Sequence, residues 1–403
     1  MPAEQPPTPP AGVRNLLELA REHLGMELAF VGEFRGEDEL MRVVVGDETK
    51  VRIHQDTSIP LEGSYCHRMV DGTLSCFVPD ARSDARVNRL RVTRTANIGA
   101  YIGVPIVFSD GRLYGAFCCL SSSPVPSLAE RDAQFLKVLA VLAAEELERE
   151  EEGERAKRIA RDGIRSLMDP GGCLMVFQPV EELWSGKVFG FEALARFARE
   201  PVRTPDLWFD EAWALGLGPA LEIAAIRSAL LEVPKLPADC YVSLNVSPAT
   251  IVCGDVDKLL SGLDSRMLVL EITEHAAVED YQALASALRP LRERGLRLAI
   301  DDTGSGYASL RHILRLRPDA IKLDVSLTRG IDNDPALLAL ASGLTSFASR
   351  IQAVVVAEGV ETPSEAAALR ALGVRFAQGY LIGRPAPAEQ FPRGRAPDAP
   401  EAS

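Results

Sequence analysis

The sequence lacks the residue patterns of a zinc protein and of a disulfide-stapled one. It has five histidines and seven cysteines, and no two cysteines form a CxxC pair. An odd number of scattered cysteines argues against a disulfide framework. Without a cluster of histidine and cysteine, the sequence does not predict a zinc site. We therefore interpret most of the cysteines as small buried apolar residues.

Long apolar runs and an excess of positive charge are also missing. No uninterrupted apolar stretch is long enough to span a membrane. The first twelve residues are rich in proline and lack the basic and apolar segments of a secretion signal. A net charge of −13 argues against a general surface for DNA or RNA. We expect a cytoplasmic protein with no membrane insertion and no DNA or RNA partner.

The length and the apolar content of the chain suffice for two folded domains. The chain has 403 residues, of which 47% are apolar, and a single ordinary domain is shorter than this. We expect disordered ends over 1–12 and 389–403, where proline is frequent. Between them we predict a first domain over 13–126, a helical linker over 127–168 and a second domain over 169–388.

The first domain has the pattern of an antiparallel sheet with flanking helices. A helical segment over 13–24 precedes two strand-like segments. Two later apolar segments, 100–106 and 112–120, are separated by Ser109-Asp110-Gly111, which is typical of a hairpin turn. These features indicate a mixed α/β domain.

The predicted linker begins as an amphipathic helix and becomes strongly acidic. Ser127 and Glu130 have the spacing of a capping box. After a short apolar repeat, the helix continues into the charged run 145–152. We interpret this run as a solvated linker helix, and a helix that mediates dimerisation is the alternative.

Six apolar segments of the second domain each end on an acidic residue or its amide. Each segment is typical of a buried strand, and most of the intervals are typical of helices. Repeated strand–helix units close into a barrel whose strand ends meet at one mouth. Clustered carboxylates repel one another unless a cation neutralises them, so the pattern predicts a hydrolytic site with magnesium or manganese. The residues at these ends are Glu192, Asn245, Glu271, Asp301 with Asp302, Asp324 and Glu358.

The first two strands depart from a regular barrel. The segments 174–180 and 187–197 are linked through Trp184-Ser185-Gly186. A parallel return needs a crossover of about a dozen residues or more, so these strands must be antiparallel. With six further strands, we predict a modified TIM barrel of eight strands with one strand reversed.

The same residues resemble the EAL family of cyclic di-GMP phosphodiesterases. The triplet that names the family stands here as Glu192-Ala193-Leu194, and the other motifs follow in family order over roughly 170–388. An ordered set of motifs is far more specific than one triplet. The motifs are Phe177-Gln178-Pro179-Val180, Leu244-Asn245-Val246-Ser247, Leu270-Glu271-Ile272-Thr273-Glu274, Ala320-Ile321-Lys322-Leu323-Asp324, Val356-Ala357-Glu358-Gly359-Val360-Glu361-Thr362 and Ala377-Gln378-Gly379-Tyr380.

This resemblance implies a barrel enzyme that hydrolyses cyclic di-GMP to the linear dinucleotide pGpG with a pair of magnesium or manganese ions. It assigns the metal ligands as Glu192, Asn245, Glu271, Asp301, Asp302 and Glu358. It assigns catalytic roles to Lys322, which orients the attacking water, to Glu361, which lies near that water, and to Glu192 and Glu358. It assigns substrate contacts to Gln178, Leu194, Arg196 and Gln378. Simpler structural roles remain open, such as an ion pair inside the barrel for Lys322 and a helix cap for Glu361.

One loop departs from the family pattern. The family usually has Asp-Phe-Gly-Thr-Gly after the paired aspartates, whereas this chain has Asp302-Thr303-Gly304-Ser305-Gly306. Glu274, which anchors this loop in the family, is retained. The missing phenyl ring bears on loop packing, on the dimer contact and on turnover, although every ligand type is kept. The string Asp-Thr-Gly-Ser also resembles aspartic proteases, but nothing else in the chain does.

The first domain resembles a GAF sensor domain. The resemblance lies in Tyr65-Cys66-His67, Pro79-Asp80-Ala81 and the strand-like segments 101–106 and 114–118. It implies a sensor whose ligand the sequence does not identify. Cys66 and His67 resemble a pair that holds bilin in some GAF domains, but the surrounding pattern does not match, and we interpret them as a buried structural pair.

The leading hypothesis is therefore a homodimeric cyclic di-GMP phosphodiesterase regulated by its GAF domain through the linker helix. The alternative is a catalytically inactive EAL domain that acts as a cyclic di-GMP receptor. A protein-interaction scaffold that binds no nucleotide is a third possibility. No GGDEF-like segment is present, so synthesis of the dinucleotide is not expected.

Overall fold

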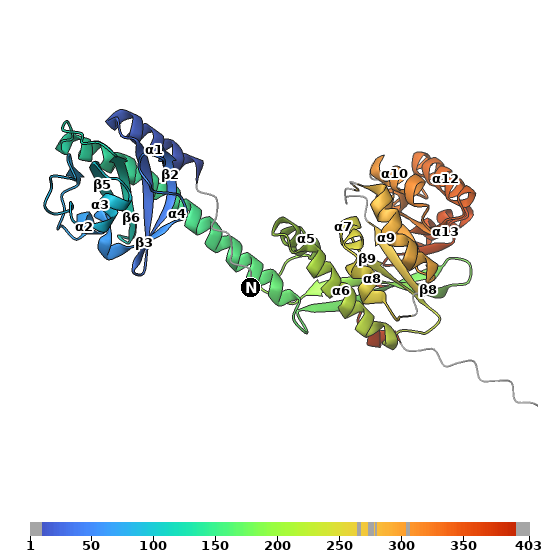
Figure 1. The fold of residues 1–403 in the computed structure, drawn as a ribbon. Helices are drawn as coiled ribbons and strands as arrows, with labels where there is room; N and C mark the ends of the chain where they lie inside the picture. Colours follow the sequence, from blue (N-terminus) through green and yellow to red (C-terminus); the bar gives the residue numbers. More distant parts are fainter. Residues whose placement is uncertain (1–9, 264–266, 273–277, 279, 304–306, 392–403) are drawn as a thin grey trace, which may run out of the picture. The chain divides into compact units, whose positions relative to one another are not determined.

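The computed structural model describes residues 10–263, 267–272, 278, 280–303 and 307–391, and the side chains of 302, 303 and 307–310 lie outside the described part (Figure 1). The chain divides into two compact units, Met1–Lys157 and Arg158–Ser403. Each unit is described by itself below.

The first unit is an antiparallel sheet with helices on both faces. Its strand order is β3-β2-β1-β6-β5-β4, and every pairing is antiparallel. The hairpin predicted at Ser109-Asp110-Gly111 joins β5 to β6. The predicted antiparallel sheet is confirmed. The strands are β1 (Leu28–Arg35), β2 (Asp38–Gly46), β3 (Ser58–Pro60), β4 (Phe77–Val78), β5 (Ala100–Val107) and β6 (Leu113–Ser121).

Alternation along the strands gives this sheet two separate cores. Helices α1 (Ala11–Leu24) and α4 (Glu130–Leu167) pack on the face that carries Phe117 and Cys119. Helices α2 (Tyr65–Val70) and α3 (Arg91–Thr95) lie on the other side, where α2 packs on the face that carries Cys118. Successive side chains of a strand point to opposite faces, so the adjacent cysteines belong to different cores.

Helix α4 belongs to both units. It is 38 residues long. Its first part buries Leu136 and Leu147 in the core of the first unit. Its last turns bury Ile164 and Leu167 against Trp208 in the second unit. Among the described residues, no helix is both long enough and apolar enough to cross a bilayer.

The acidic run of α4 differs from the solvated segment that the sequence suggests. The carboxylate of Glu150 accepts a hydrogen bond from buried Arg42 at 3.1 Å. Glu148 accepts from the backbone and hydroxyl of Ser109, each at 2.8 Å, and Glu151 pairs with Arg112. These partners lie in β2 and around the β5–β6 hairpin, which the local pattern of the helix does not reveal.

The second unit is a closed barrel of eight strands in the order β10-β11-β12-β13-β14-β7-β8-β9. Strand β7 runs antiparallel to both of its neighbours, β8 and β14. All other pairings are parallel. The predicted modified TIM barrel with one reversed strand is confirmed. Its strands are β7 (Cys173–Glu182), β8 (Lys187–Phe197), β9 (Tyr241–Asn245), β10 (Leu268–Ile272), β11 (Arg297–Thr303), β12 (Ala320–Leu323), β13 (Val354–Ala357) and β14 (Phe376–Gln378).

Helices surround this barrel and bury its outer face. Apolar side chains of the strands, such as Leu270 and Ile321, share one core with helix residues such as Leu288 and Ala341. Because the parallel strands carry their carboxyl ends to the same edge, the residues that follow them meet at one mouth. The helices are α5 (Pro205–Ala214), α6 (Gly218–Glu232), α7 (Pro248–Val252), α8 (Asp255–Leu260), α9 (Tyr281–Glu293), α10 (Tyr307–Leu316), α11 (Val325–Thr328), α12 (Pro335–Arg350) and α13 (Pro363–Ala371).

Candidate active site

Five charged side chains from different strands meet at the mouth of the barrel. Glu192 lies on β8, Glu271 on β10, Asp301 on β11 and Lys322 on β12. Glu358 follows directly after β13. The ammonium group of Lys322 lies at the centre of the four carboxylates, so the carboxylates meet around a cation that the chain itself supplies.

The distances show how tightly this acidic cluster is drawn together. From Lys322 Nζ, the nearest carboxylate oxygen lies at 2.7 Å in Glu358, 2.9 Å in Glu271, 3.1 Å in Asp301 and 3.3 Å in Glu192. The Lys322 side chain is only 3% exposed. One ammonium cannot neutralise four buried carboxylates, so an excess of negative charge remains.

The protonation of the cluster reflects this imbalance. Burial raises the pKa of Glu271 to about 8, although Lys322 opposes the shift. Burial likewise raises the pKa of Glu358 well above its usual value. Burial lowers the pKa of Lys322, but the carboxylates, Asp301 first, raise it more, so the net shift is upward. The lysine stays charged, and the free cluster holds protons that a metal cation would displace.

Amide side chains complete the site around Glu192. Asn245 Nδ2 donates to one oxygen of Glu192 at 2.9 Å. Gln378 Nε2 donates to the other oxygen at 2.7 Å and to Gln178 Oε1 at 2.9 Å. Gln178 in turn donates to the carbonyl oxygen of Gly383 at 3.1 Å. Both oxygens of Glu192 are therefore fixed by donors, and three of the residues that the resemblance selected lie beside it.

The donor set fits divalent cations. Oxygen atoms of Glu192, Glu271 and Asp301 lie within 4.8 Å of one another. All are carboxylates, the ligands that magnesium and manganese prefer. The register of β11 against β12 shifts between Ile300 and Thr303, at the paired aspartates. The side chain of Asp302 and all of Glu274, predicted as a ligand and as a loop anchor, lie outside the described residues.

The structure does not join every predicted residue to the acidic cluster. Glu361 forms an ion pair with Arg329 and is 41% exposed. It does not cap the following helix either, because Thr362 is the N-cap of α13 and Glu365 completes the capping box. The helix-cap alternative for Glu361 is therefore wrong. Arg196 is exposed and donates to the carbonyl oxygen of Ala195 at 2.7 Å.

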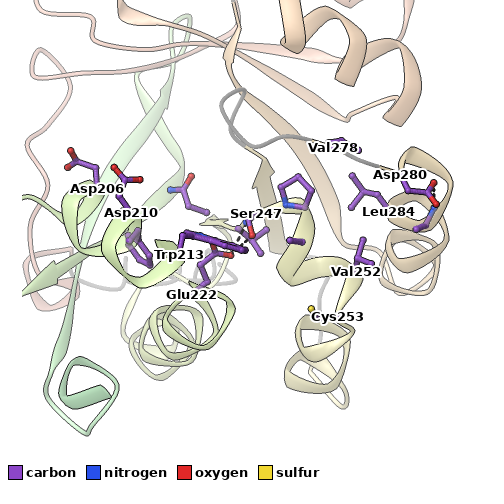
Figure 2. Close-up of a pocket in the computed structure, with 16 residues that line it drawn as sticks. Asp206, Asp210, Trp213, Glu222, Ser247, Val252, Cys253, Val278, Asp280 and Leu284 are labelled. Atoms are coloured by element: carbon purple, nitrogen blue, oxygen red, sulfur yellow. Dashed lines mark hydrogen bonds between the residues drawn. The ribbon is translucent and has the colours of Figure 1, made fainter. Parts of the chain in front are cut away.

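Two cavities adjoin the site. One of about 350 Å³ is lined by Leu194, Arg196, Phe209 and Asn245, among others. A larger one of about 840 Å³ lies between α5, α6, α7 and α9 and also reaches Asn245 (Figure 2). Two of the four residues predicted to contact substrate, Leu194 and Arg196, therefore line the smaller cavity.

A sequence profile of the EAL domain matches residues 162–385, more than half of the chain. The chain belongs to the EAL family. A GAF domain profile matches residues 9–148. The profile matches overlap the predicted domains without fixing their limits, which stay a prediction.

Two relatives of this EAL protein carry names that refer to cyclic di-GMP. It is 32% identical to the cyclic di-GMP phosphodiesterase NbdA of Pseudomonas aeruginosa, over 76% of this chain and 40% of NbdA. It is 31% identical to the probable cyclic di-GMP phosphodiesterase PdeA of Escherichia coli, over 64% of this chain and 36% of PdeA. The chain thus spans less than half the length of these curated relatives.

Solved structures agree with the fold. The PaMucR phosphodiesterase in its c-di-GMP complex is 29% identical, with a TM-score of 0.50 over 57% of this chain and 98% of that one. An EAL domain protein from Listeria monocytogenes EGD-e is 23% identical, with a TM-score of 0.50 over 57% of this chain and 93% of that one. The Listeria structure supports the fold alone.

The EAL barrel holds one further polar residue that sequence reasoning missed. Glu222 on α6 is 8% exposed. It accepts hydrogen bonds from Trp213 Nε1 at 3.0 Å and from the backbone and hydroxyl of Ser247, each at 2.9 Å (Figure 2). Ser247 is the N-cap of α7 and follows Asn245 by two residues. Glu222 therefore fixes the chain directly behind Asn245.

A sequence signal for Glu222 exists. It precedes Ala225 and Ile226 at three- and four-residue spacing, on a helix face that is otherwise apolar and buried. An acid on such a face needs partners. The partners, Trp213 and Ser247, come from other elements, so the signal indicates a buried acid without indicating its role.

Proposed function

We propose that this chain is a cytoplasmic, metal-dependent phosphodiesterase that hydrolyses cyclic di-GMP to linear pGpG. The observation that carries the proposal is the cluster of four buried carboxylates around Lys322 at the mouth of an EAL barrel. The names of NbdA and PdeA support the choice of substrate.

The residues that would hold two divalent ions are the predicted ligands. When bound, such ions supply Lewis-acid stabilisation of the phosphate charge and lower the pKa of a coordinated water. The chain holds Glu192 in place through Asn245 and Gln378. Lys322 keeps a permanent positive charge among the carboxylates, where it offsets negative charge that develops during hydrolysis. The proposed ligands are Glu192, Asn245, Glu271, Asp301, Asp302 and Glu358.

We assign Leu194, Arg196 and Glu361 to the rim of the site. Arg196 and Leu194 line the smaller cavity, and we assign the exposed guanidinium to a substrate phosphate, because arginine matches phosphate geometry. Glu361 forms an ion pair with Arg329, and we propose that it leaves this pair to act at the reaction centre. We therefore assign it a supporting role near the attacking water.

Metal removal tests this proposal. The full-length chain with magnesium or manganese is expected to convert cyclic di-GMP to pGpG, because every proposed ligand offers an oxygen atom, the donor that these ions prefer. A chelator should abolish product formation, and excess magnesium or manganese should restore it. Chromatography of the nucleotides follows both steps. Tight binding of cyclic di-GMP without product under either metal would reject catalysis and leave the receptor function.

Glu222→Gln tests whether the buried acid on α6 positions Asn245. The amide can accept with one atom only, so a donor from Trp213 or Ser247 loses its partner, at about 1–3 kcal/mol. We expect kcat/KM to fall roughly tenfold or more, together with weaker activation by magnesium. Steady-state kinetics at several magnesium concentrations measures both. Glu232→Gln, at the end of the same helix, is the control and should change neither.

Helix α4 carries an apolar stripe that supports the proposed homodimer and regulation. Val138, Val141 and Leu142 are 61%, 60% and 43% exposed, at three- and four-residue spacing. Pairing of two such stripes would bury them. The opposite face of α4 packs in the GAF core, and its end packs in the EAL core. A change in the GAF domain therefore has a continuous helix along which to act.

Removal of residues 1–157 tests both parts of this proposal. The remaining chain, 158–403, keeps Ile164 and Leu167 but loses the apolar stripe and the GAF domain. It should be monomeric by light scattering, whereas the full chain should be dimeric. Its turnover rate should differ from that of the full chain. Equal mass per particle and equal turnover for the two proteins would contradict dimerisation through α4 and regulation by the GAF domain.

A further inference from the structure

Two cysteines of the GAF domain are in contact across its core. Cys66 lies on α2 and Cys118 on β6, 52 residues apart in the chain. Their sulfur atoms are 3.1 Å apart, and the two residues are 2% and 0% exposed. Two thiols this close need only a small movement to reach the length of a disulfide bond.

Glycine on the neighbouring strand makes room for this sulfur pair. Gly103 of β5 lies opposite Cys118 of β6. A Cβ atom at Gly103 would lie 2.7 Å from Cys118 Sγ and 2.2 Å from the hydroxyl oxygen of Tyr101. That hydroxyl is 3.6 Å from Cys118 Sγ. A side chain at position 103 would therefore displace the sulfur atom and the hydroxyl group beside it.

A buried acid lies beside the pair. Glu39 of β2 is 0% exposed, and neither carboxylate oxygen has a hydrogen-bond partner among the described residues. Burial raises the pKa of Glu39, although the nearby Cys66 thiol and Ser64 hydroxyl act in the opposite direction. No lysine or arginine of the described chain forms an ion pair with Glu39. Burial of an acid without an ion-pair partner raises the free energy of the folded state. Glu39 has no evident structural role that would explain this cost.

A small cavity joins these groups. It has a volume of about 20 Å³ and is lined by Glu39, Cys66, Ser64 and Tyr101, among others. A water molecule needs about 10–15 Å³ measured in this way. The cavity thus has room for a molecule of the size of water or hydrogen peroxide, and none for a nucleotide or a tetrapyrrole.

We propose that Cys66 and Cys118 form a peroxide-sensing thiol pair that closes to a disulfide in the GAF core. In the first step, the Cys66 sulfur attacks one oxygen of hydrogen peroxide and the O–O bond breaks. Glu39 accepts the thiol proton and passes it to the leaving oxygen, which departs as water. Cys66 is left as a sulfenic acid.

In the second step, the Cys118 sulfur attacks the Cys66 sulfur and the S–O bond breaks. The hydroxide leaves with the Cys118 proton as a second water. The two thiols lose two electrons in total, the peroxide gains them, and the products are one disulfide and two waters. Burial raises the pKa of the Cys66 thiol well above its usual value, so the attack depends on a base, which Glu39 provides. Because Cys66 is buried, bulky reagents reach it slowly.

Cysteine mapping of the full-length chain tests the proposal. Hydrogen peroxide should lower the number of free thiols from seven to five, measured after denaturation and alkylation. Mass spectrometry should find a peptide with Cys66 linked to one with Cys118, lighter by two hydrogens and separated by a reductant. Unchanged thiols, or links spread over other cysteines, would overturn the proposal.

Matched variants distinguish Cys118 from Cys119, which lie on the same tryptic peptide. Cys119 is buried in the other core, so Cys119→Ser should keep the link and Cys118→Ser should lose it. Cys118→Ser should instead leave a Cys66 sulfenic acid, which dimedone traps when it is present during denaturation. Glu39→Gln should slow closure at least about tenfold, since it removes the base. If Cys118→Ser does not fold, the link mapped in Cys119→Ser still shows whether Cys118 is the partner of Cys66. Loss of the link in Cys119→Ser would contradict the assignment.

Discussion

Glu192→Gln is expected to lower the hydrolysis of cyclic di-GMP by at least about a thousandfold, equivalent to about 4 kcal/mol of transition-state stabilisation. The substitution removes a charge that the proposed metal ions require. It also places an amide NH₂ against Asn245 Nδ2 or Gln378 Nε2, which now donate to the two carboxylate oxygens. The change is nearly isosteric, so the effect comes from charge and hydrogen bonding rather than from packing.

The control for Glu192→Gln is the same substitution at an acidic residue outside the site. Glu293, exposed at the end of α9, is matched in chemistry, and Glu293→Gln should retain full activity. Measurement of kcat/KM with saturating magnesium gives the ratio, and calorimetry reports whether cyclic di-GMP still binds. Activity of Glu192→Gln within tenfold of the unmodified chain would be incompatible with the proposed ligand role.

Lys322→Met should lower the free energy of unfolding of the barrel more than any other substitution described above. It removes the only cation in contact with the four carboxylates among the described residues. Loss of one partner from a buried ion pair costs about 3–5 kcal/mol. Magnesium should reduce this deficit, because a bound divalent cation replaces the missing positive charge. Hydrolysis should fall as well, since the permanent charge beside the substrate is gone.

Urea unfolding with and without magnesium measures the effect. The three tryptophans, Trp184, Trp208 and Trp213, all lie in the second unit, so their fluorescence reports the barrel and not the GAF domain. Lys258→Met is the control, because the Lys258 side chain is 76% exposed. An unchanged midpoint for Lys322→Met without metal would show that the carboxylates do not depend on this lysine.

The barrel and most of its site could be predicted because the signals are local. An apolar segment that ends on an acid is visible within five residues, and parallel strands bring such ends together, as with Glu192 and Glu271. The short link through Ser185 excluded a parallel crossover and so identified the reversed strand. Neither inference required knowledge of distant contacts.

The parts that escaped prediction depend on partners far away in the chain. Glu361 pairs with Arg329, 32 residues earlier, so its motif alone does not show that it lies apart from the cluster. Glu222 is held by Trp213 and Ser247 from two other elements. The anchoring of the acidic run in α4 depends on Arg42, 108 residues before Glu150. No spacing rule connects such pairs.

The same limit applies to the cysteines. An odd count of cysteines argues against a disulfide framework, and most of the cysteines are buried, as expected. The contact between Cys66 and Cys118 joins α2 to β6 and follows from the topology of the sheet. Local sequence could not distinguish Cys118 from Cys119, although the alternation of strand faces sends them to different cores.

The central claim is that the carboxylates at the barrel mouth bind a pair of divalent cations. Anomalous scattering from a manganese-soaked crystal of the full-length chain tests it most directly. Two manganese peaks are expected among the oxygens of Glu192, Glu271, Asp301 and Glu358, with Lys322 still beside them. A difference map without a manganese peak in contact with these oxygens, at a metal concentration that saturates activity, would contradict it.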